Sequence, residues 1–184
     1  ETLDGVAAIK VGDKITTDHI MPAGARLKYR SNVPQYAKYV FEHVDAAFYK
    51  NASAIRDAGR HVVIVAGESY GQGSSREHAA MCPMYLGVKA VLARSIERIH
   101  CANLINFGIV PFIFDRPEDY DAIAKGDELT CDAFRSALAG DGRVTFVNAS
   151  RGTSFTATAA LSDRQKRIVL NGGLLAAVAA GHVS

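Results

Sequence analysis

Short apolar runs alternate with stretches of helical periodicity over residues 6–114. The runs have the length and β-branched content of buried strands, and they lie at residues 6–11, 62–66, 90–93 and 109–114. Helical patterns lie between them, over 33–57 in one piece or two, over 76–86 and over 95–107. Parallel strands need a crossover connection, which is usually a helix. The alternation therefore predicts an α/β fold with a parallel sheet.

The remainder of the chain follows a different pattern. Residues 143–149 and 154–160 alternate apolar and polar positions, which predicts a β-hairpin or two edge strands. A helix is predicted over 162–170, and Ser95 is expected to cap the earlier helix over 95–107. No internal repeat, low-complexity tract or linker interrupts the sequence. Residues 1–184 are therefore expected to form a single domain.

Composition narrows the class of protein. The 48% hydrophobic and 22% charged residues are typical of a globular chain. A net charge of +2 argues against a nucleic acid or an anionic membrane as partner. No apolar run approaches the roughly 20 residues of a membrane span. The chain opens at Glu1 rather than Met, from which we expect a piece excised from a longer protein.

The cysteines and histidines give no metal-ligand pattern. Cys82, Cys101 and Cys131 are odd in number and widely spaced, so neither a disulfide framework nor a zinc knuckle is expected. A reducing, cytoplasmic location fits three free thiols. His19 and His78 are expected to make structural hydrogen bonds, because no metal spacing surrounds them.

The segment with the clearest chemistry is Gly67–His78, with the sequence Gly–Glu–Ser–Tyr–Gly–Gln–Gly–Ser–Ser–Arg–Glu–His. It lies where a predicted strand becomes a predicted helix. Such a turn offers unpaired backbone N–H groups and the positive end of a helix dipole, both of which suit an anion. Ser74, Ser75 and Arg76 would add two hydroxyl donors and a cation. The pattern indicates a carboxylate or phosphate ligand.

Each candidate residue also has an ordinary structural explanation. Ser74 is a favoured type of helix N-cap. Asp18 lies in a loop rich in Thr and Gly, where it could close a turn. Arg30 considered alone is a surface arginine. Residue chemistry by itself leaves both interpretations open.

Two groups of motifs resemble one family. The first is Gly12–Gly24, which contains Thr–Thr–Asp–His–Ile–Met–Pro, followed by Leu27–Lys–Tyr–Arg30. The second is Tyr70–Ala80, followed by Leu86–Val91 and Ser95–Leu104. Together they resemble the C-terminal, swivelling domain of aconitase. The resemblance implies a three-layer β/β/α arrangement.

The resemblance also implies an activity and a division of labour. Aconitases are hydro-lyases that isomerise citrate and isocitrate through cis-aconitate, using a 4Fe–4S cluster. The cluster is held by other domains, so this chain is expected to bind none and to work with cluster-bearing domains of the same chain or a separate large subunit. By motif, Ser74 resembles the catalytic base, and Asp18 the acidic residue that supports the catalytic acid. Arg30, Ser75 and Arg76 resemble residues that bind the tricarboxylate substrate.

Two other functions remain open from the sequence. The small subunits of isopropylmalate isomerase and homoaconitase share the Gly–Ser–Ser–Arg–Glu–His loop, although Thr–Thr–Asp–His–Ile favours aconitase. A phosphate- or RNA-binding module is the third possibility. No Gly–Lys–Ser/Thr motif follows the loop, and no basic stripe is present, which argues against it.

Overall fold

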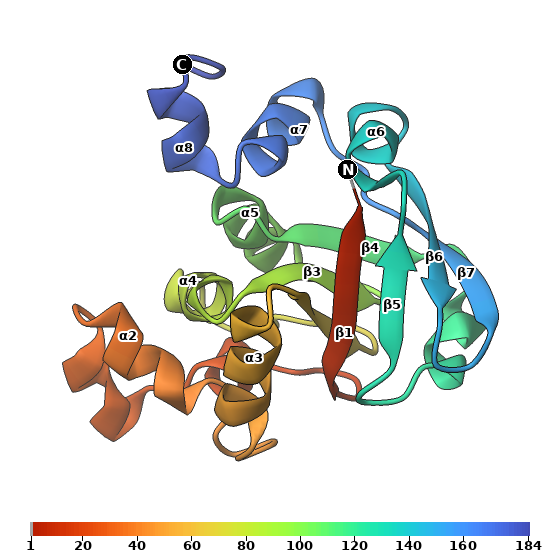
Figure 1. Cartoon of the computed structure of the whole chain (residues 1–184). Coiled ribbons are helices and arrows are strands. Elements are labelled where there is room, and N and C mark those ends of the chain that lie inside the picture. The colour runs from red at the N-terminus through yellow and green to blue at the C-terminus, as the bar shows by residue number, and fades with distance from the viewer. Residues whose placement is uncertain (1) are drawn as a thin grey trace.

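The computed structural model describes residues 2–184, whose strands join edge to edge into a closed barrel (Figure 1). Hydrogen bonds link the strands in the order β1–β2–β3–β4–β7–β6–β5, and β5 pairs with β1. The α/β class expected from the sequence is confirmed. The strands are β1 (Leu3–Lys10), β2 (His61–Ala66), β3 (Val88–Ala93), β4 (Val110–Phe114), β5 (Glu128–Cys131), β6 (Arg143–Asn148) and β7 (Thr153–Thr158).

One half of the barrel is parallel and covered by helices. β1 to β4 run parallel to one another, and their crossover helices lie on the side away from β5, β6 and β7 (Figure 1). These helices include α3 (Phe48–Asp57), α4 (His78–Tyr85) and α5 (Arg98–Asn106). Parallel strands covered on both faces read as continuous apolar runs, which is why the sequence pattern located them.

The other half of the barrel is antiparallel and partly exposed. β6 and β7 pair antiparallel, with Phe146 opposite Phe155, so the predicted hairpin is confirmed. Val144 and Phe146 are buried, whereas the residues between and beside them on β6, Arg143, Thr145 and Val147, are exposed. An antiparallel sheet with one face in water gives this alternation.

Two hydrophobic cores follow from the alternation of side chains along the strands. Val62 and Ile64 of β2 pack outward with Phe48 of α3 and other apolar residues of the helical side. Val63 packs into the second core, inside the barrel. This core contains residues of all seven strands, of α6 (Phe134–Ala139) and of α7 (Asp163–Leu170). Successive side chains of a strand point to opposite faces, so one apolar strand supplies both cores.

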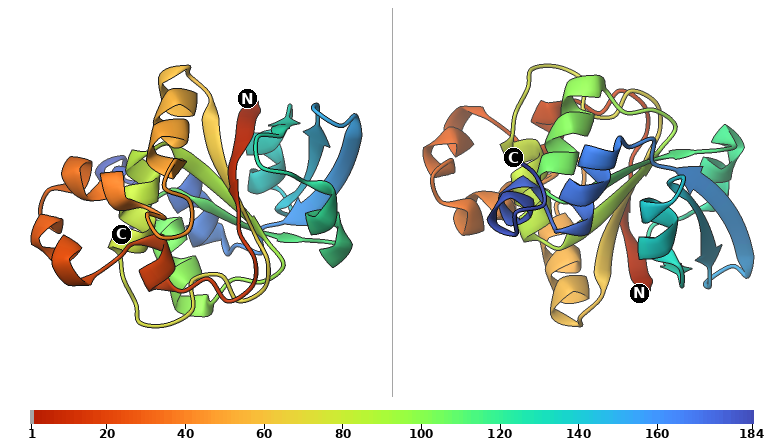
Figure 2. Two further views of the ribbon diagram at one scale, coloured as in Figure 1. Left: turned by 90° about the horizontal axis from the view of Figure 1, so that it is seen from below. Right: turned by 90° about the horizontal axis from the view of Figure 1, so that it is seen from above.

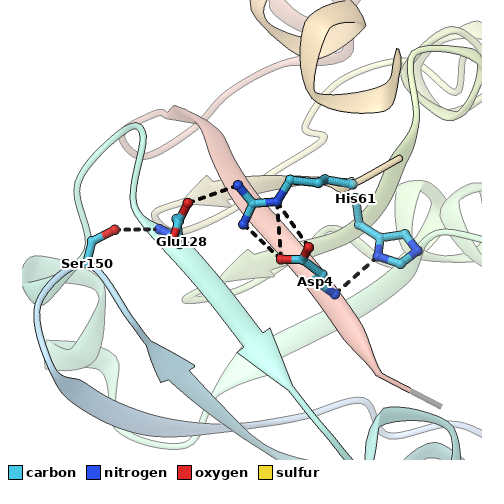
Figure 3. A network of polar contacts seen from close by, with 5 residues as sticks. Asp4, His61, Glu128 and Ser150 are labelled. Carbon is cyan, nitrogen blue, oxygen red and sulfur yellow. Dashed lines mark hydrogen bonds and ion pairs between the residues drawn. The ribbon is translucent and has the colours of Figure 1, made fainter. Parts of the chain in front are cut away.

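An ion-pair network joins β1 to β5 where the barrel closes (Figure 3). Arg60 donates through Nη2 to Asp4 at 2.8 Å and through Nη1 to Glu128 at 2.9 Å. The Asp4 N–H donates to His61 Nδ1 at 3.3 Å, and the Glu128 N–H donates to Ser150 Oγ at 2.9 Å. These side chains are partly exposed, so each pair adds about 0–1 kcal/mol, and the two cores dominate stability.

Residues 24–39 project from the barrel on the side opposite β5, β6 and β7 (Figure 2). They form η1 (Gly24–Tyr29), α2 (Val33–Tyr36) and η2 (Ala37–Tyr39). Tyr36 is buried, and its hydroxyl donates to the Pro22 carbonyl at 2.9 Å. The rings of Tyr29 and Tyr39 stack with centroids 5.5 Å apart. The projecting segment is therefore braced by its own aromatic residues.

One helix cap differs from the sequence expectation, and one helical stretch is divided. The N-cap of α5 is Glu97, and Ser95 instead accepts a hydrogen bond from the Ser69 N–H at 2.8 Å. The helical stretch predicted over 33–57 in one piece or two is divided, because Phe41 has a φ of 58° and the chain turns before α3. A residue in the left-handed conformation cannot continue a right-handed helix. The hydrophobic pattern of the sequence did not show that Phe41 adopts this conformation.

The helix predicted over 162–170 is confirmed as α7, but it is not the terminal helix, because α8 (Leu174–Ala179) follows it. The Ser162 hydroxyl accepts from the Gln165 N–H, and the Gln165 side chain accepts from the Ser162 N–H. This reciprocal capping box fixes the first turn. The sequence pattern did not predict β5, α6, α1 (Thr17–Ile20), η3 (Pro117–Ala122) or α8.

The strands form one closed barrel and are not divided into two separate sheets. The three-layer β/β/α arrangement therefore stays a prediction. None of the helices within residues 2–184 has the length and hydrophobicity that a bilayer span requires.

Candidate functional site

The loops that follow β1, β2 and β3 meet at one edge of the parallel strands. Thr16 forms a parallel bridge with Gln72, and Tyr70 forms one with Ile96. The Gly71 N–H donates to the Ile15 carbonyl at 2.8 Å. The carboxyl ends of parallel strands are where α/β proteins commonly bind ligands. The loop 67–77 is thus held between its two neighbours at this edge.

The loop can adopt its path only with glycine at 71. Gly71 has a φ of +85°, and a Cβ built there would lie 2.3 Å from the His100 ring. Gly73 also has a positive φ, +103°, but its Cβ would meet only Thr17 Oγ1, at 3.7 Å. Two left-handed residues in close succession turn the chain so that Ser74 and Ser75 are exposed.

Unpaired backbone donors line the segment from Gly73 to His78. Within residues 2–184, their N–H groups donate to no other residue. The N-cap of α4 is Glu77, without a side-chain cap, and the Ser74 hydroxyl makes no hydrogen bond to another described residue. Ser74 is therefore not the helix cap that one interpretation of the sequence allowed. Free N–H groups at a helix N-terminus suit an anion, as expected.

Asp18 and Arg76 form an ion pair across two loops. Arg76 Nη1 donates to Asp18 Oδ1 at 2.6 Å and to the Met21 carbonyl at 3.2 Å. Asp18 Oδ1 also accepts from the Ala23 N–H at 3.2 Å, which is the turn-closing contact that its loop suggested. The Arg76 hydrogen bond is the main cause that lowers the pKa of Asp18. Asp18 therefore stays ionised and orients Arg76.

Two contacts hold the serines from either side. The Thr17 hydroxyl donates to the Ser74 carbonyl at 2.9 Å. The Asn103 Nδ2 of α5 donates to Ser75 Oγ at 3.3 Å. Sequence reasoning assigned no role to Thr17 or Asn103, although both lie inside motifs that carried the family resemblance. Their importance comes from spatial proximity, which the motif alone does not show.

Arg30 is tied to the loop through its backbone. It ends η1, and His78 Nε2 donates to the Arg30 carbonyl at 2.8 Å. His19 Nδ1 accepts from the Thr16 N–H at 2.9 Å, so the expectation that His19 and His78 make structural hydrogen bonds is confirmed. The Arg30 guanidinium is exposed and pairs with no other group among residues 2–184. It is available to an anion.

The cysteines do not form a set suited to an iron–sulfur cluster. Cys82 packs in the outer core, whereas Cys131 packs in the barrel core and Cys101 lies on its margin. Burial raises the pKa of all three thiols, which disfavours the thiolate that a cluster needs. No grouping of three metal-ligating residue types occurs among residues 2–184. The residues present do not fit a cluster, and where the cluster is bound stays a prediction.

The fold and the site together define an α/β barrel protein, with a loop at one edge that carries unpaired N–H groups, two serines and an arginine. Residues 10–117 match the family model described as the aconitase C-terminal domain. The chain belongs to this family. The roles of the five predicted site residues stay predictions.

The curated relatives comprise both long and short proteins. The mitochondrial aconitate hydratase of Candida albicans is 39% identical over 139 residues, which cover 66% of this chain and 18% of that protein. The 3-isopropylmalate dehydratase small subunit 2 of Archaeoglobus fulgidus is 45% identical over 125 residues, covering 68% of this chain and 69% of that protein. The chain spans less than a quarter of the length of these mitochondrial relatives. In the probable mitochondrial aconitate hydratase of Dictyostelium discoideum the matched part is 23% of the protein.

The solved structures include a similar chain of the same extent. It is a 3-isopropylmalate dehydratase from Methanocaldococcus jannaschii, with a TM-score of 0.76 and 28% sequence identity. The superposition covers 98% of this chain and 95% of that one.

We expect acid to destabilise the chain through His100. This residue is 2% exposed, and burial lowers its pKa from 6.5 to about 4. The unfolded chain binds a proton here as the pH falls below 6.5, while the folded chain resists until about pH 4. Stability is therefore full above pH 6.5 and declines toward pH 4, by about 3 kcal/mol from this group.

Urea unfolding at pH 7 and pH 4.5 measures this loss, with His100→Asn as the comparison. The variant cannot titrate here, so its free energy of unfolding should decline less between the two pH values. Equal declines would contradict the prediction, because carboxylates common to both proteins would then explain all of the loss.

Proposed function

We propose that this chain is the substrate-binding, base-supplying swivel domain of an iron–sulfur hydro-lyase that interconverts citrate and isocitrate through cis-aconitate. The main support is the cluster of anion-binding groups at one edge of the barrel. Arg76 is held by Asp18 at 2.6 Å, and the N–H groups of residues 73–78 are unpaired within residues 2–184. The exposed Ser74 and Arg30 lie on segments tied to the same edge.

Removing a proton from carbon beside a carboxylate places negative charge on the carboxylate oxygens. Fixed donors stabilise that charge best in a site closed to water. In our proposal Arg30 grips one substrate carboxylate through two parallel N–H groups. Arg76, Ser75 and the unpaired N–H groups face a second carboxylate. The positive end of α4 and Arg76 lower the cost of ionising the Ser74 hydroxyl, which takes the proton.

The removed hydroxyl needs an acid and an electrophile, and residues 2–184 hold no residue set suited to the cluster. We therefore include a partner in the proposal, either cluster-bearing domains of a longer chain or a separate large subunit. The Archaeoglobus relative is named a small subunit, which supports the second arrangement. The three-layer swivel arrangement and a cytoplasmic location belong to the same proposal.

A second candidate is the small subunit of an isopropylmalate isomerase. The similarity to the Methanocaldococcus structure, with a TM-score of 0.76 and 28% sequence identity, favours it. The unpaired Arg30 guanidinium favours the tricarboxylate, because citrate carries one carboxylate more than isopropylmalate. An isopropyl group would instead need an apolar surface in that position.

The test combines this chain with a cluster-bearing partner and follows the absorbance of cis-aconitate. We expect turnover of citrate and isocitrate, with a higher kcat/KM than for 3-isopropylmalate. A site that binds a charged group discriminates strongly against an analogue lacking it, by about 10⁴-fold in favourable cases.

This chain alone is the control, and it should turn over neither substrate, because no group of cluster ligands occurs among the residues that the structure describes. Preference for 3-isopropylmalate would replace the first proposal with the second. Turnover by the isolated chain would contradict both.

A further inference from the structure

His100 lies directly behind the loop that carries the serines. Its ring contacts Gly71 so closely that a Cβ at 71 would approach it to 2.3 Å. His100 is on α5, three residues before Asn103, and residues three apart share a helix face. Asn103 donates to Ser75 Oγ at 3.3 Å. One face of α5 therefore supports the loop at both Gly71 and Ser75, and α5 lies beside α4 (Figure 1).

The histidine is not explained by hydrogen bonding. Both ring nitrogens of His100 are buried and have no partner among residues 2–184, and the same is true of the Tyr70 hydroxyl. The two rings meet edge to face with centroids 5.3 Å apart. Buried polar groups are normally paired, so an unpaired group in a native structure calls for an explanation. Here the buried ring packs against the loop of the proposed active site.

We propose that His100 is a positioning residue, whose ring sets the path of residues 71–75 and so holds the Ser74 hydroxyl where it meets substrate. This inference rests on the proposed function. The other binding groups have independent supports: Asp18 and the Met21 carbonyl hold Arg76, and His78 holds the Arg30 backbone. His100 therefore affects the base more than substrate binding.

A double-mutant cycle between His100 and Gly71 tests the contact in the complete enzyme. Gly71→Ala inserts a methyl group into the ring and should lower kcat by about 100-fold, the cost of a displacement near 1 Å. His100→Gly removes the ring together with the His100 Cβ, which would lie 2.4 Å from the new methyl group, and it should also lower kcat. KM should change less than about threefold, because the arginines keep their supports. In the double variant the methyl group has room, so the two losses should not multiply.

Gly73→Ala is the matched control. It imposes a side chain at a similarly positive φ, but its Cβ would lie far from His100. Combined with His100→Gly, its loss of kcat should multiply, because removing His100 relieves no contact of a side chain that meets only Thr17 Oγ1 within 4 Å. Multiplying losses for Gly71 as well would overturn the proposal. If Gly71→Ala alone fails to fold, the double variant should fold, and its failure would also overturn the proposal.

Two further measurements separate positioning from other roles. In the isolated chain, His100→Ala should reduce protection of the Gly71 amide from hydrogen exchange and leave the β6–β7 amides unchanged. This result does not depend on any activity, so it distinguishes failure of the inference from failure of the proposed function. In the complete enzyme, His100→Gln should keep the wild-type dependence of kcat on pH. Unchanged protection of Gly71, or a lost limb of the pH profile, would contradict a positioning role.

Discussion

Replacing Ser74 by alanine in the complete enzyme is expected to lower kcat by at least about 100-fold, the lower end of general-base contributions. A base acts in the transition state, so its loss appears in kcat, while substrate affinity changes little. The hydroxyl is exposed and bonds no other residue within 2–184, and α4 begins at Glu77 without a side-chain cap. The substitution therefore removes the proposed base without breaking a hydrogen bond within residues 2–184.

Steady-state assays with isocitrate, together with thermal melting, test this expectation. Ser154→Ala is the matched control, since Ser154 is an exposed serine on β7 in the antiparallel half of the barrel. Both variants should melt at the wild-type temperature, and only Ser74→Ala should lose activity. A Ser74→Ala enzyme that retains wild-type kcat would show that the base lies elsewhere. A lowered melting temperature would instead reveal a structural role for the hydroxyl.

The fold was predictable where the hydrophobic pattern of a short segment directly reflects which faces of that segment are buried. The strands of the parallel half are apolar on both faces, and the β6–β7 hairpin alternates cleanly, so short windows of sequence contain the signal. β5 is a strand of Glu128 to Cys131, too short for either period to show. The closure of the barrel depends on pairing between β1 and β5, which are far apart in sequence, and no local pattern encodes it.

The candidate site was predictable through its motifs but not through its contacts. The predicted turn from strand to helix indicated an anion site at Ser74, Ser75 and Arg76, and the resemblance added Asp18 and Arg30. The structure places Asp18 against Arg76, a partnership between residues 58 positions apart. The support from Asn103 likewise depends on how α5 packs against the loop. Such contacts follow from tertiary packing, which a sequence window cannot show.

Replacing Arg30 by lysine in the complete enzyme should weaken substrate binding although the charge is kept. A planar carboxylate meets a guanidinium through two parallel N–H bonds, whereas an ammonium offers a single charged point. Losing one charge-assisted hydrogen bond should raise Kd by about 10- to 100-fold. The structure leaves this guanidinium without a partner among residues 2–184, so the substitution breaks no internal contact.

Binding of citrate and isocitrate, measured by calorimetry on the intact enzyme, provides the test. Arg116→Lys is the control, because the Arg116 side chain is exposed and, among residues 2–184, forms an ion pair with Glu118 alone, at 3.2 Å. This substitution should leave Kd unchanged. The two variants should then differ in the quantity that changes, which is Kd for Arg30→Lys and kcat for Ser74→Ala. An unchanged Kd for Arg30→Lys would remove the reason for preferring a tricarboxylate. The isopropylmalate isomerase proposal, which does not need that cation, would then be favoured.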